Sequence, residues 1–527
     1  MEAIKIQPQF EDLSKPETLL NHVEQLTKPN EATPHAEILK KLLEQIEPLD
    51  FVLLSFPEVE KVRNELTKLN NERVKDPENE DVKNAILKKL NELKKFKVNI
   101  KHYLILSIEN ILKVAENNRW GLCKNHDFIY LYNGTHWEEL DKGIFKKFLG
   151  DAAEKMGVPI FLAQYHKFRK ELFEQFLETA YLPVPEPDKD TVLINLQNGT
   201  FEINKAGTIL RPFERSDFIT YQLPFEYEPT AKAPIFQKYL DEVLPDKDRQ
   251  KVLAEYLGFV FIKHGSNRLK EEKALILYGT GANGKSVFFE IVSALLGTEN
   301  TSNYSLQSLT NNTGYFRAKL ANKLVNYGSE INGKLESSLF KQLVSGEPVE
   351  ARLPYGQPFI LKQYAKMIFN SNELPKDVEH TNAFFRRFLI VPFDITIPPE
   401  KQDKTLHVKI IENELSGVFN WVLDGLNRLL EQKHFTHSEA VKQALDTYKS
   451  QSDSVKMFVE ESNYTKHATE YKLIKDLYTE YRNYCLEDGF KPVNKSNFIK
   501  RLSVFGVLVE RNMHGNVAYL VNETLDF

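Results

Sequence analysis

A glycine-rich loop between an apolar strand and an apolar helix constrains this chain more than any other feature of its sequence. Residues Ala274–Tyr278 read ALILY, which is typical of a buried strand, and they run directly into Gly279–Ser286, which reads GTGANGKS. The glycines allow backbone amides to turn inward around a phosphate, and the following helix directs the positive end of its dipole at the same point. The order of strand, glycine loop and helix therefore predicts an α/β domain that binds a nucleotide.

Each residue type in this loop suits contact with ATP and Mg²⁺. Lys285 would neutralise the β and γ phosphates, and the hydroxyl of Ser286 would ligate the metal. The helix is expected to reach Leu296, because apolar residues recur at helical spacing up to a stop at Gly297. We therefore expect a nucleotide site made of Gly279, Thr280, Gly281, Ala282, Asn283, Gly284, Lys285 and Ser286.

Two segments beyond the loop supply candidate catalytic side chains. Glu330 ends the segment KLVNYGSE, where a strand would bring a carboxylate beside the magnesium and the attacking water. Asn372 ends the segment KMIFNSN and could sense the γ-phosphate, with Asn370 as the less favoured candidate. A surface position at a strand end is the alternative for Glu330, because Asn326 weakens the apolar run before it.

A pair of arginines, Arg386 and Arg387, precedes the apolar segment FLIVPF. From such a place a guanidinium can reach ATP that is bound by a neighbouring subunit. The alternative is a solvated pair on a surface helix.

Composition limits the class of protein. With 527 residues and 42% hydrophobic content, the chain is long enough for several domains, each with its own core. Its two cysteines, Cys123 and Cys485, have no paired spacing, which argues against a disulfide framework or a cysteine-rich zinc site and favours a reducing, cytoplasmic setting. The apolar runs are too short or too broken to span a bilayer, so no membrane role is expected. A net charge of -5 is neutral on nucleic-acid binding, because a local basic channel remains possible.

Changes in periodicity divide the chain into six regions. Residues 1–100 are expected to form a helical arm that either packs on its own chain or docks a partner. Residues 101–230 are expected to form an α+β module with a β-turn at Asn133-Gly134 and no catalytic signature. A helical collar at 231–265, the ATPase motor at 266–400, a helical connector at 401–453 and a small C-terminal domain at 454–527 follow.

The C-terminal region is predicted to be a winged helix. Helices are expected over Tyr471–Leu486 and Asn494–Phe505, and two short strands around Met513–Gly515. The second helix carries basic side chains that could contact duplex origin DNA. They are Lys495, Lys500 and Arg501. A docking site for another protein is the alternative.

Several motifs together resemble helicase superfamily three, in its branch of phage and plasmid primase-helicases related to the poxvirus primase-helicase. They are the glycine loop, Ser329-Glu330, the run LVSGEPVEAR at 343–352, FNSNELP at 369–375 and FRRF at 385–388. The resemblance extends from about residue 104 to residue 520. Only one carboxylate, Glu330, stands where the family often has an acidic pair, and the first hundred residues leave no room for a primase palm.

The resemblance implies an AAA+ type motor in a homo-hexameric ring, with ATP between subunits and single-stranded DNA in the central pore. It assigns phosphate and metal binding to Lys285 and Ser286, water activation and metal binding to Glu330, and sensing to Asn372. It assigns the arginine finger to Arg386 or Arg387, with Arg387 slightly preferred. It also maps a pore hairpin to residues 350–359. Candidate DNA contacts in or beside this hairpin are Arg352, Tyr355 and Lys362, although an ordinary hairpin is the alternative.

The sequence therefore predicts an α/β P-loop NTPase core with a helical N-terminal region, an α+β module and a C-terminal winged helix. The leading hypothesis for function is an ATP-dependent, ring-forming DNA helicase that replicates a phage, plasmid or other mobile element in a bacterial host. A separate primase or polymerase would then be its partner. The alternatives are an ATP-gated origin-binding initiator or scaffold, and a related motor recruited to a mobile-element or defence complex.

Overall fold

The computed structural model describes residues 32–125, 128–180, 188–328, 331, 335–354, 356–375 and 378–522. The chain divides into two compact units. Unit 1 comprises residues 1–187 with 211–221, and unit 2 comprises 188–210 with 222–527. The predicted α+β module at 101–230 is thus distributed over both units. Within the described residues, no helix has the length and apolar character needed to cross a membrane.

Unit 1 is built from helices and one small antiparallel sheet. Its helices are α2 (His35–Gln45), α3 (Phe51–Ser55), α4 (Val59–Lys75), α5 (Glu80–Leu93), α6 (Ile100–Asn117), α7 (Lys142–Lys155), α8 (Ile160–Ala163) and α9 (His166–Thr179). Strands β1 (Leu122–Asn125), β2 (Phe128–Tyr132) and β3 (Trp137–Glu139) form the sheet in that order. The turn between β2 and β3 contains Gly134 at φ 100°, as the Asn133-Gly134 pair predicts.

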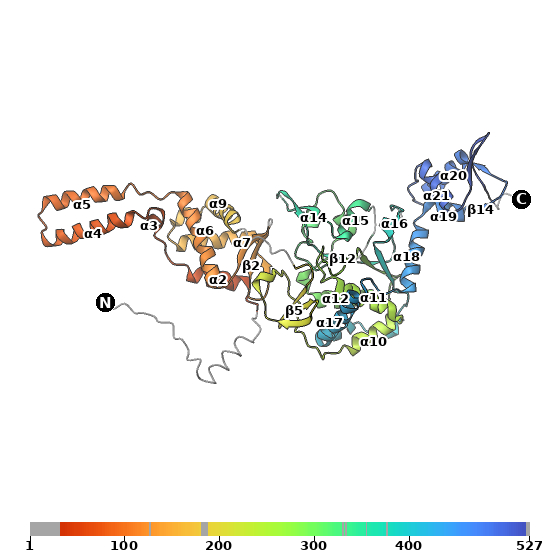
Figure 1. The fold of residues 1–527 in the computed structure, drawn as a ribbon, viewed down its shortest axis with the longest axis horizontal. Coiled ribbons are helices and arrows are strands. Elements are labelled where there is room, and N and C mark those ends of the chain that lie inside the picture. The colour runs from red at the N-terminus through yellow and green to blue at the C-terminus, as the bar shows by residue number, and fades with distance from the viewer. Residues whose placement is uncertain are drawn as a thin grey trace. The chain divides into compact units, whose positions relative to one another are not determined.

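Helices α4 and α5 form a helical hairpin within the region expected to be a helical arm (Figure 1). Asn79 begins α5 by accepting hydrogen bonds from the amides of Asp81 and Val82. The core of unit 1 lies elsewhere, among α2, α6, α7 and α9. Phe145 and Phe176 lie at its centre, fully buried, with ring centroids 4.7 Å apart.

Unit 2 contains a five-stranded sheet in the order β13-β7-β12-β9-β8, with every neighbouring pair parallel. The strands are β7 (Ala274–Tyr278), β8 (Thr301–Ser302), β9 (Val325–Gly328), β12 (Lys366–Ser371) and β13 (Phe388–Pro392). Strand β7 is an interior strand, between β13 and β12, and nearly all of its side chains are buried, as expected for a parallel strand covered on both faces. All five strands therefore deliver their carboxyl ends to one edge of the sheet.

The sheet of unit 2 is surrounded by helices. They are α10 (Pro234–Val243), α11 (Lys247–Phe259), α12 (Lys285–Leu296), α13 (Leu306–Leu309), α14 (Tyr315–Ala318), α15 (Ser337–Ser345), α16 (Asn382–Phe385), α17 (Leu406–Gln432) and α18 (Glu439–Gln451). Helix α17 packs closely on α11. A Cβ at Gly258 would lie 2.6 Å from the Cβ of Leu426, and one at Gly425 would lie 2.3 Å from the carbonyl carbon of Ala254. Glycine at both positions lets these two helices approach to backbone contact.

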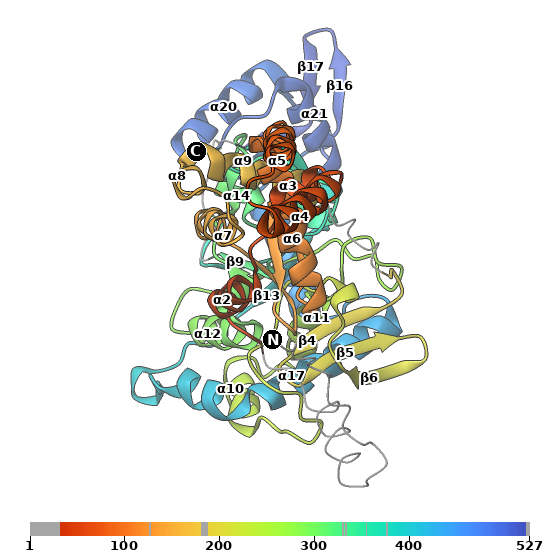
Figure 2. The same cartoon turned by 90° about the vertical axis from the view of Figure 1, so that its left-hand side faces the viewer.

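Two further β elements belong to this part of the chain. Strands β4 (Val192–Leu196), β5 (Gly199–Asn204) and β6 (Gly207–Arg211) lie side by side in one small sheet (Figure 2). Strands β10 (Val349–Arg352) and β11 (Pro358–Leu361) form an antiparallel hairpin. This hairpin overlaps the segment 350–359 that the sequence singled out.

The C-terminal region contains the two predicted helices and the two predicted strands, together with further elements that the sequence did not indicate. Its elements are α19 (Ser454–Glu461), β14 (Tyr464–Lys466), β15 (Lys472–Leu473), α20 (Ile474–Glu487), α21 (Lys495–Val504), β16 (Val509–Asn512), β17 (Gly515–Ala518) and β18 (Leu520–Asn522). The strands β15, β17 and β16 form an antiparallel sheet, in which β16 and β17 turn at Met513-His514. Phe458, Tyr481 and Phe498 pack together in a separate core under it.

Candidate active site

The glycine loop, Gly279–Ser286, connects the carboxyl end of β7 to α12, which begins at Lys285. A Cβ at Gly279 would lie 2.2 Å from Nδ2 of Asn283 and 2.3 Å from the carbonyl oxygen of Phe393. Gly284 has φ 86°, and a Cβ there would lie 2.7 Å from Val243. The close-packed turn therefore has no room for a side chain at either position.

The loop is held from two directions. Nδ2 of Asn283 donates to the carbonyl of Phe393 at 2.9 Å, and the amide of Ile397 donates to the carbonyl of Ala282 at 2.7 Å. From α10, the hydroxyl of Tyr239 donates to the carbonyl of Gly284 at 2.8 Å. Sequence reasoning missed Tyr239, because nothing in the pattern of α10 indicates that it reaches the loop.

Lys285 projects its ammonium back across the loop. Nζ donates to the carbonyl oxygen of Gly279 at 2.6 Å, to Oδ1 of Asn283 at 3.2 Å and to Oδ1 of Asn372 at 3.3 Å. Only 6% of Lys285 is exposed, and this burial lowers the pKa of its ammonium. No carboxylate among the described residues pairs with it. A buried cation that meets only neutral oxygens would be stabilised by an anion.

Several backbone amides of the glycine loop also lack a hydrogen-bond acceptor among the described residues. No described residue accepts a hydrogen bond from the amides of Gly281, Gly284 or Lys285. Unpartnered amides at the start of a helix form an anion-binding site. The loop therefore has the donors and the charge to hold a phosphate.

Asn372 reaches Lys285 because of the sheet register. Strands β12 and β7 are parallel, with Ser371 opposite Tyr278, so the chain leaves both strands at the same level. Asn370 faces another neighbour, and its Oδ1 accepts a hydrogen bond from the hydroxyl of Tyr327 on β9 at 3.2 Å. Of the two asparagines considered from sequence, Asn372 is the one beside the loop.

Glu330, and Ser329 before it, lie outside the described residues. The strand that leads to them, β9, ends at Gly328 and pairs in parallel with β12. That end belongs to the same edge of the sheet as the glycine loop.

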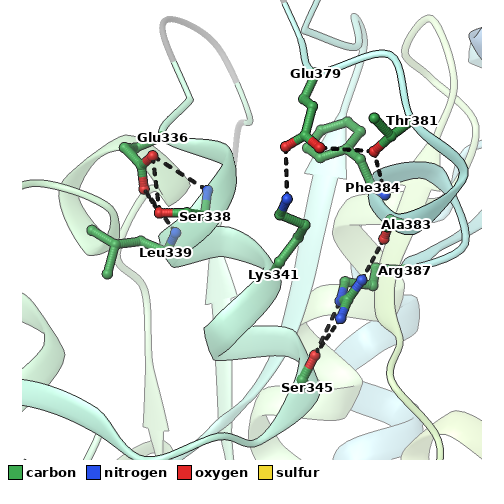
Figure 3. Close-up of polar contacts among 10 residues, drawn as sticks. All are labelled: Glu336, Ser338, Leu339, Lys341, Ser345, Glu379, Thr381, Ala383, Phe384 and Arg387. Atoms are coloured by element: carbon green, nitrogen blue, oxygen red, sulfur yellow. Dashed lines mark hydrogen bonds and ion pairs between the residues drawn. The ribbon is translucent and has the colours of Figure 1, made fainter.

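Arg387 is anchored inside its own chain (Figure 3). It is 7% exposed, and its guanidinium donates to Oγ of Ser345 at 2.7 and 3.0 Å and to the carbonyl of Ala383. It also pairs with Glu272 at 3.1 Å. Arg387 therefore ties the end of α15 to α16 and β13.

A second ion pair joins the same two segments. Nζ of Lys341 on α15 donates to Glu379 at 2.7 Å, as Figure 3 shows. The side chain of Glu379 also accepts from the hydroxyl of Thr381, which caps α16. Helix α15 is thus bound at two points to the segment that carries the arginines.

Arg386 has a different environment from Arg387. Its side chain is 56% exposed, and the guanidinium pairs with Glu272 at 2.9 Å. Its carbonyl accepts from Nζ of Lys273 at 2.7 Å. Arg386 is therefore the arginine whose side chain is accessible from outside the unit.

The hairpin β10–β11 carries two of the predicted DNA contacts on its exposed side. Arg352 and Lys362 are exposed, and Nε of Arg352 donates to the carbonyl of Gly356 at 3.0 Å. Tyr355 lies outside the described residues. The base of the hairpin is fixed by Arg317 of α14, a residue that sequence reasoning missed, which donates to the carbonyl of Glu350 at 2.7 Å.

The three basic residues predicted to contact DNA in the C-terminal region have different environments. Lys495 and Lys500 on α21 are exposed. Arg501 instead pairs with the buried Asp453 at 3.2 Å, so its guanidinium is already used within the chain. Contact with a ligand from α21 would depend on the lysines.

Comparison with known proteins adds an independent observation. The family "D5 N terminal like" matches residues 111–245, and the family of unknown function DUF5906 matches residues 277–387. The second match runs from the end of β7 to the arginine pair. A protein of Acanthamoeba polyphaga mimivirus named "Putative helicase L207/L206" is 26% identical over 245 residues, which are 43% of this chain and 24% of that protein. This chain is a relative of the phage-type primase-helicases.

The relationship predicted from the sequence motifs is thereby confirmed. The chain spans about a quarter of the length of the curated relative that it matches. Among solved structures, two apo structures of the C-terminal region of NrS-1 each cover 78% of this chain and 98% of their own. Both are 14% identical to it, with TM-scores of 0.44 and 0.42.

Proposed function

We propose that the protein is an ATP-driven motor, a DNA helicase that serves the replication of a phage, plasmid or other mobile element in the cytoplasm of a bacterial host. One observation carries the proposal: the glycine loop holds a buried Lys285 ammonium 3.3 Å from Asn372, with neutral oxygens as its only described partners. The similarity to a protein named as a putative helicase supports DNA as the substrate along which the motor moves.

The residues of the loop fit ATP with Mg²⁺. The loop amides and Lys285 would hold the phosphates, and the exposed hydroxyl of Ser286 would ligate the metal together with Glu330. When bound, the metal neutralises charge that develops on the phosphate oxygens. Glu330 would orient or deprotonate the attacking water, and Asn372 would hydrogen-bond the terminal phosphate.

We further propose a P-loop core of AAA+ type that assembles as a homo-hexameric ring, with ATP between subunits. In such a ring Arg386 is better suited than Arg387 to reach a neighbour's ATP, because its side chain is the more exposed. Its ion pair with Glu272 would have to open. Single-stranded DNA would run through the pore, where the hairpin β10–β11 offers Arg352, Tyr355 and Lys362.

The C-terminal region would be a winged helix that contacts duplex DNA through Lys495 and Lys500, while Arg501 would act through its ion pair with Asp453. These contacts would be to phosphates, which position a protein without reading sequence. A separate primase or polymerase would complete the replication machinery.

The test is ATP hydrolysis and unwinding of forked DNA by the full chain, with and without magnesium and single-stranded DNA. Lys285→Ala should abolish both activities, whereas Lys362→Ala should retain basal hydrolysis and weaken only its stimulation by DNA. Hydrolysis without unwinding would favour the ATP-gated initiator that binds duplex origin DNA. An absence of hydrolysis in the wild-type chain would overturn the proposal.

A further inference from the structure

Unit 1 contains a pocket of about 550 Å³ that the motor chemistry does not use. Its walls come from the end of α6 and the residues after it, from the β2–β3 turn, and from the segment 213–215. The lining residues used below are Glu116, Asn118, Arg119, Trp120, Phe213 and Arg215. The volume falls within the range of sites for small organic ligands, roughly 300–1,000 Å³.

Arg119 contributes a free cation to this pocket. It is exposed, and no described residue forms a hydrogen bond or an ion pair with its guanidinium. The nearby carboxylate of Glu116 is already bound by Arg215 in a two-point contact at 2.8 and 3.0 Å. Arg119 also has a left-handed backbone, with φ 60°, which is unfavourable for a residue with a side chain.

Aromatic side chains line the same space. Trp120 and Phe213 border the pocket, and neither ring packs against another aromatic ring among the described residues. By contrast, the ring of Tyr132 in the pocket wall contacts Trp137, with centroids 5.7 Å apart. Both rings are half-buried, and Trp120 also packs against the core of unit 1, so the parts of the two rings that line the pocket are what a planar ligand could contact.

The side-chain amide of Asn118 can recognise the polar edge of a bound ligand. Nδ2 of Asn118 donates to the carbonyl of Val114 at 2.8 Å and to Gln45, which leaves its Oδ1 as an open acceptor among the described residues. Asn133, which also lines the pocket, uses Oδ1 for the amides of Thr135 and His136, so this oxygen is already engaged within the chain.

We infer that this pocket binds a nucleoside phosphate. The base would stack on Trp120 and Phe213, an N–H group on its polar edge would donate to Oδ1 of Asn118, and Arg119 would bind the phosphate. Aromatic stacking combined with an arginine is the chemistry by which proteins hold unpaired nucleotides. The ligand is either one nucleotide of a single strand or a free nucleotide. The site belongs to unit 1, whereas the glycine loop belongs to unit 2, and the inference does not depend on the proposed ATPase.

The test is photocrosslinking of the full chain, followed by mass spectrometric mapping of the adducts. One arm uses a short single-stranded oligodeoxynucleotide that contains 5-iodouracil, and the other uses 8-azidoadenosine 5′-monophosphate. We expect adducts on Trp120 or Phe213. Adducts from the oligonucleotide alone identify a strand site, and adducts from the monophosphate identify a site for free nucleotide.

Arg119→Gln should weaken the affinity of the chain for the probe that labels the pocket by about tenfold or more, because a charge-assisted phosphate contact is lost. Trp120→Phe keeps an aromatic face and should retain most of the yield. Arg73→Ala removes an exposed arginine of α4, outside the pocket, and should change nothing. ATP hydrolysis without DNA should be the same in all three variants.

The proposal is overturned if neither probe labels residues 116–120, 132–134 or 213–215. It is also overturned if Arg119→Gln leaves the yield at Trp120 unchanged while its thermal unfolding matches that of the wild type. Because the hydrolysis assay is separate, failure of the pocket proposal can be distinguished from failure of the proposed motor.

Discussion

Nζ of Lys285 lies 3.3 Å from Oδ1 of Asn372, although the two residues are 87 positions apart in the chain. The contact exists because β7 and β12 are adjacent and parallel, so that the segments after both strands meet at one edge of the sheet. It joins the cation of the glycine loop to the residue that we propose as the sensor of the terminal phosphate.

Asn372→Ala should lower kcat for ATP hydrolysis about a hundredfold, in line with the loss of one hydrogen-bonding group that acts at the reacting phosphate. Nucleotide affinity should change much less, because the loop and Lys285 remain. Asn370→Ala is the matched control, since this side chain contacts Tyr327 and lies away from Lys285. Steady-state kinetics beside a nucleotide-binding measurement would check this, and a larger loss of kcat in Asn370→Ala would contradict the assignment.

Gly279→Ala should disrupt the loop, because the new Cβ would lie 2.3 Å from the backbone oxygen of Phe393. We expect the free energy of unfolding to fall by about 1–3 kcal/mol and nucleotide binding to be lost. Gly281→Ala is a useful comparison, because space is open there and only its φ of 113° opposes a side chain. Denaturant titration and nucleotide binding should show the smaller defect in Gly281→Ala; equal behaviour would argue against the steric explanation.

Substitution of Arg387 should lower stability, whereas substitution of Arg386 should lower activity. Arg387→Ala removes a guanidinium that is only 7% exposed and leaves Ser345 without its donor, while Glu272 keeps its pair with Arg386; the free energy of unfolding should fall by about 1–3 kcal/mol. Arg386→Ala should fold normally but lack the ATP hydrolysis that depends on subunit assembly. Urea unfolding and concentration-dependent ATPase assays test the pair. An unfolded Arg386→Ala, or an Arg387→Ala of normal stability, would reverse the roles.

Lys366 should make stability depend on pH. It is 7% exposed, Nζ lies 3.0 Å from Nδ1 of His264 and 4.2 Å from the ring centroid of Phe259, and burial lowers the pKa of Lys366 to about 7. Above pH 7 the unfolded chain therefore binds a proton that the folded chain has released. The free energy of unfolding should therefore rise with pH from about 7 toward the ordinary lysine pKa, by at most about 1.4 kcal/mol per pH unit.

The comparison of Lys366→Met with the wild type isolates this contribution. The variant should be the more stable at pH 7, and its advantage should shrink as the pH rises toward 9. Lys362→Met, which removes an exposed lysine a few residues away, should show no such trend. Denaturant titrations at several pH values would measure the differences, and a pH-independent advantage of Lys366→Met would refute the titration of Lys366.

Local elements were largely predictable from the sequence. The helix after the glycine loop was expected to reach Leu296 and to stop at Gly297, and α12 does so, with Gly297 at φ 85°. The turns at Gly134 and at Met513-His514 also lie where the sequence placed them. These features depend on the periodicity of neighbouring residues and on backbone conformations that favour glycine, and both properties are carried by a few consecutive positions.

The sequence by itself thus determined the strand, the glycine loop with its lysine, the helix after it and the kinship with the primase-helicases. Only the tertiary structure decided which arginine is buried, which asparagine meets Lys285, and that Arg501 is engaged by Asp453. Each of these outcomes depends on a partner from a distant segment, such as Ser345 for Arg387. Adjacent residues of one type look equivalent in a sequence, and the register of the sheet and the packing of the helices make them different.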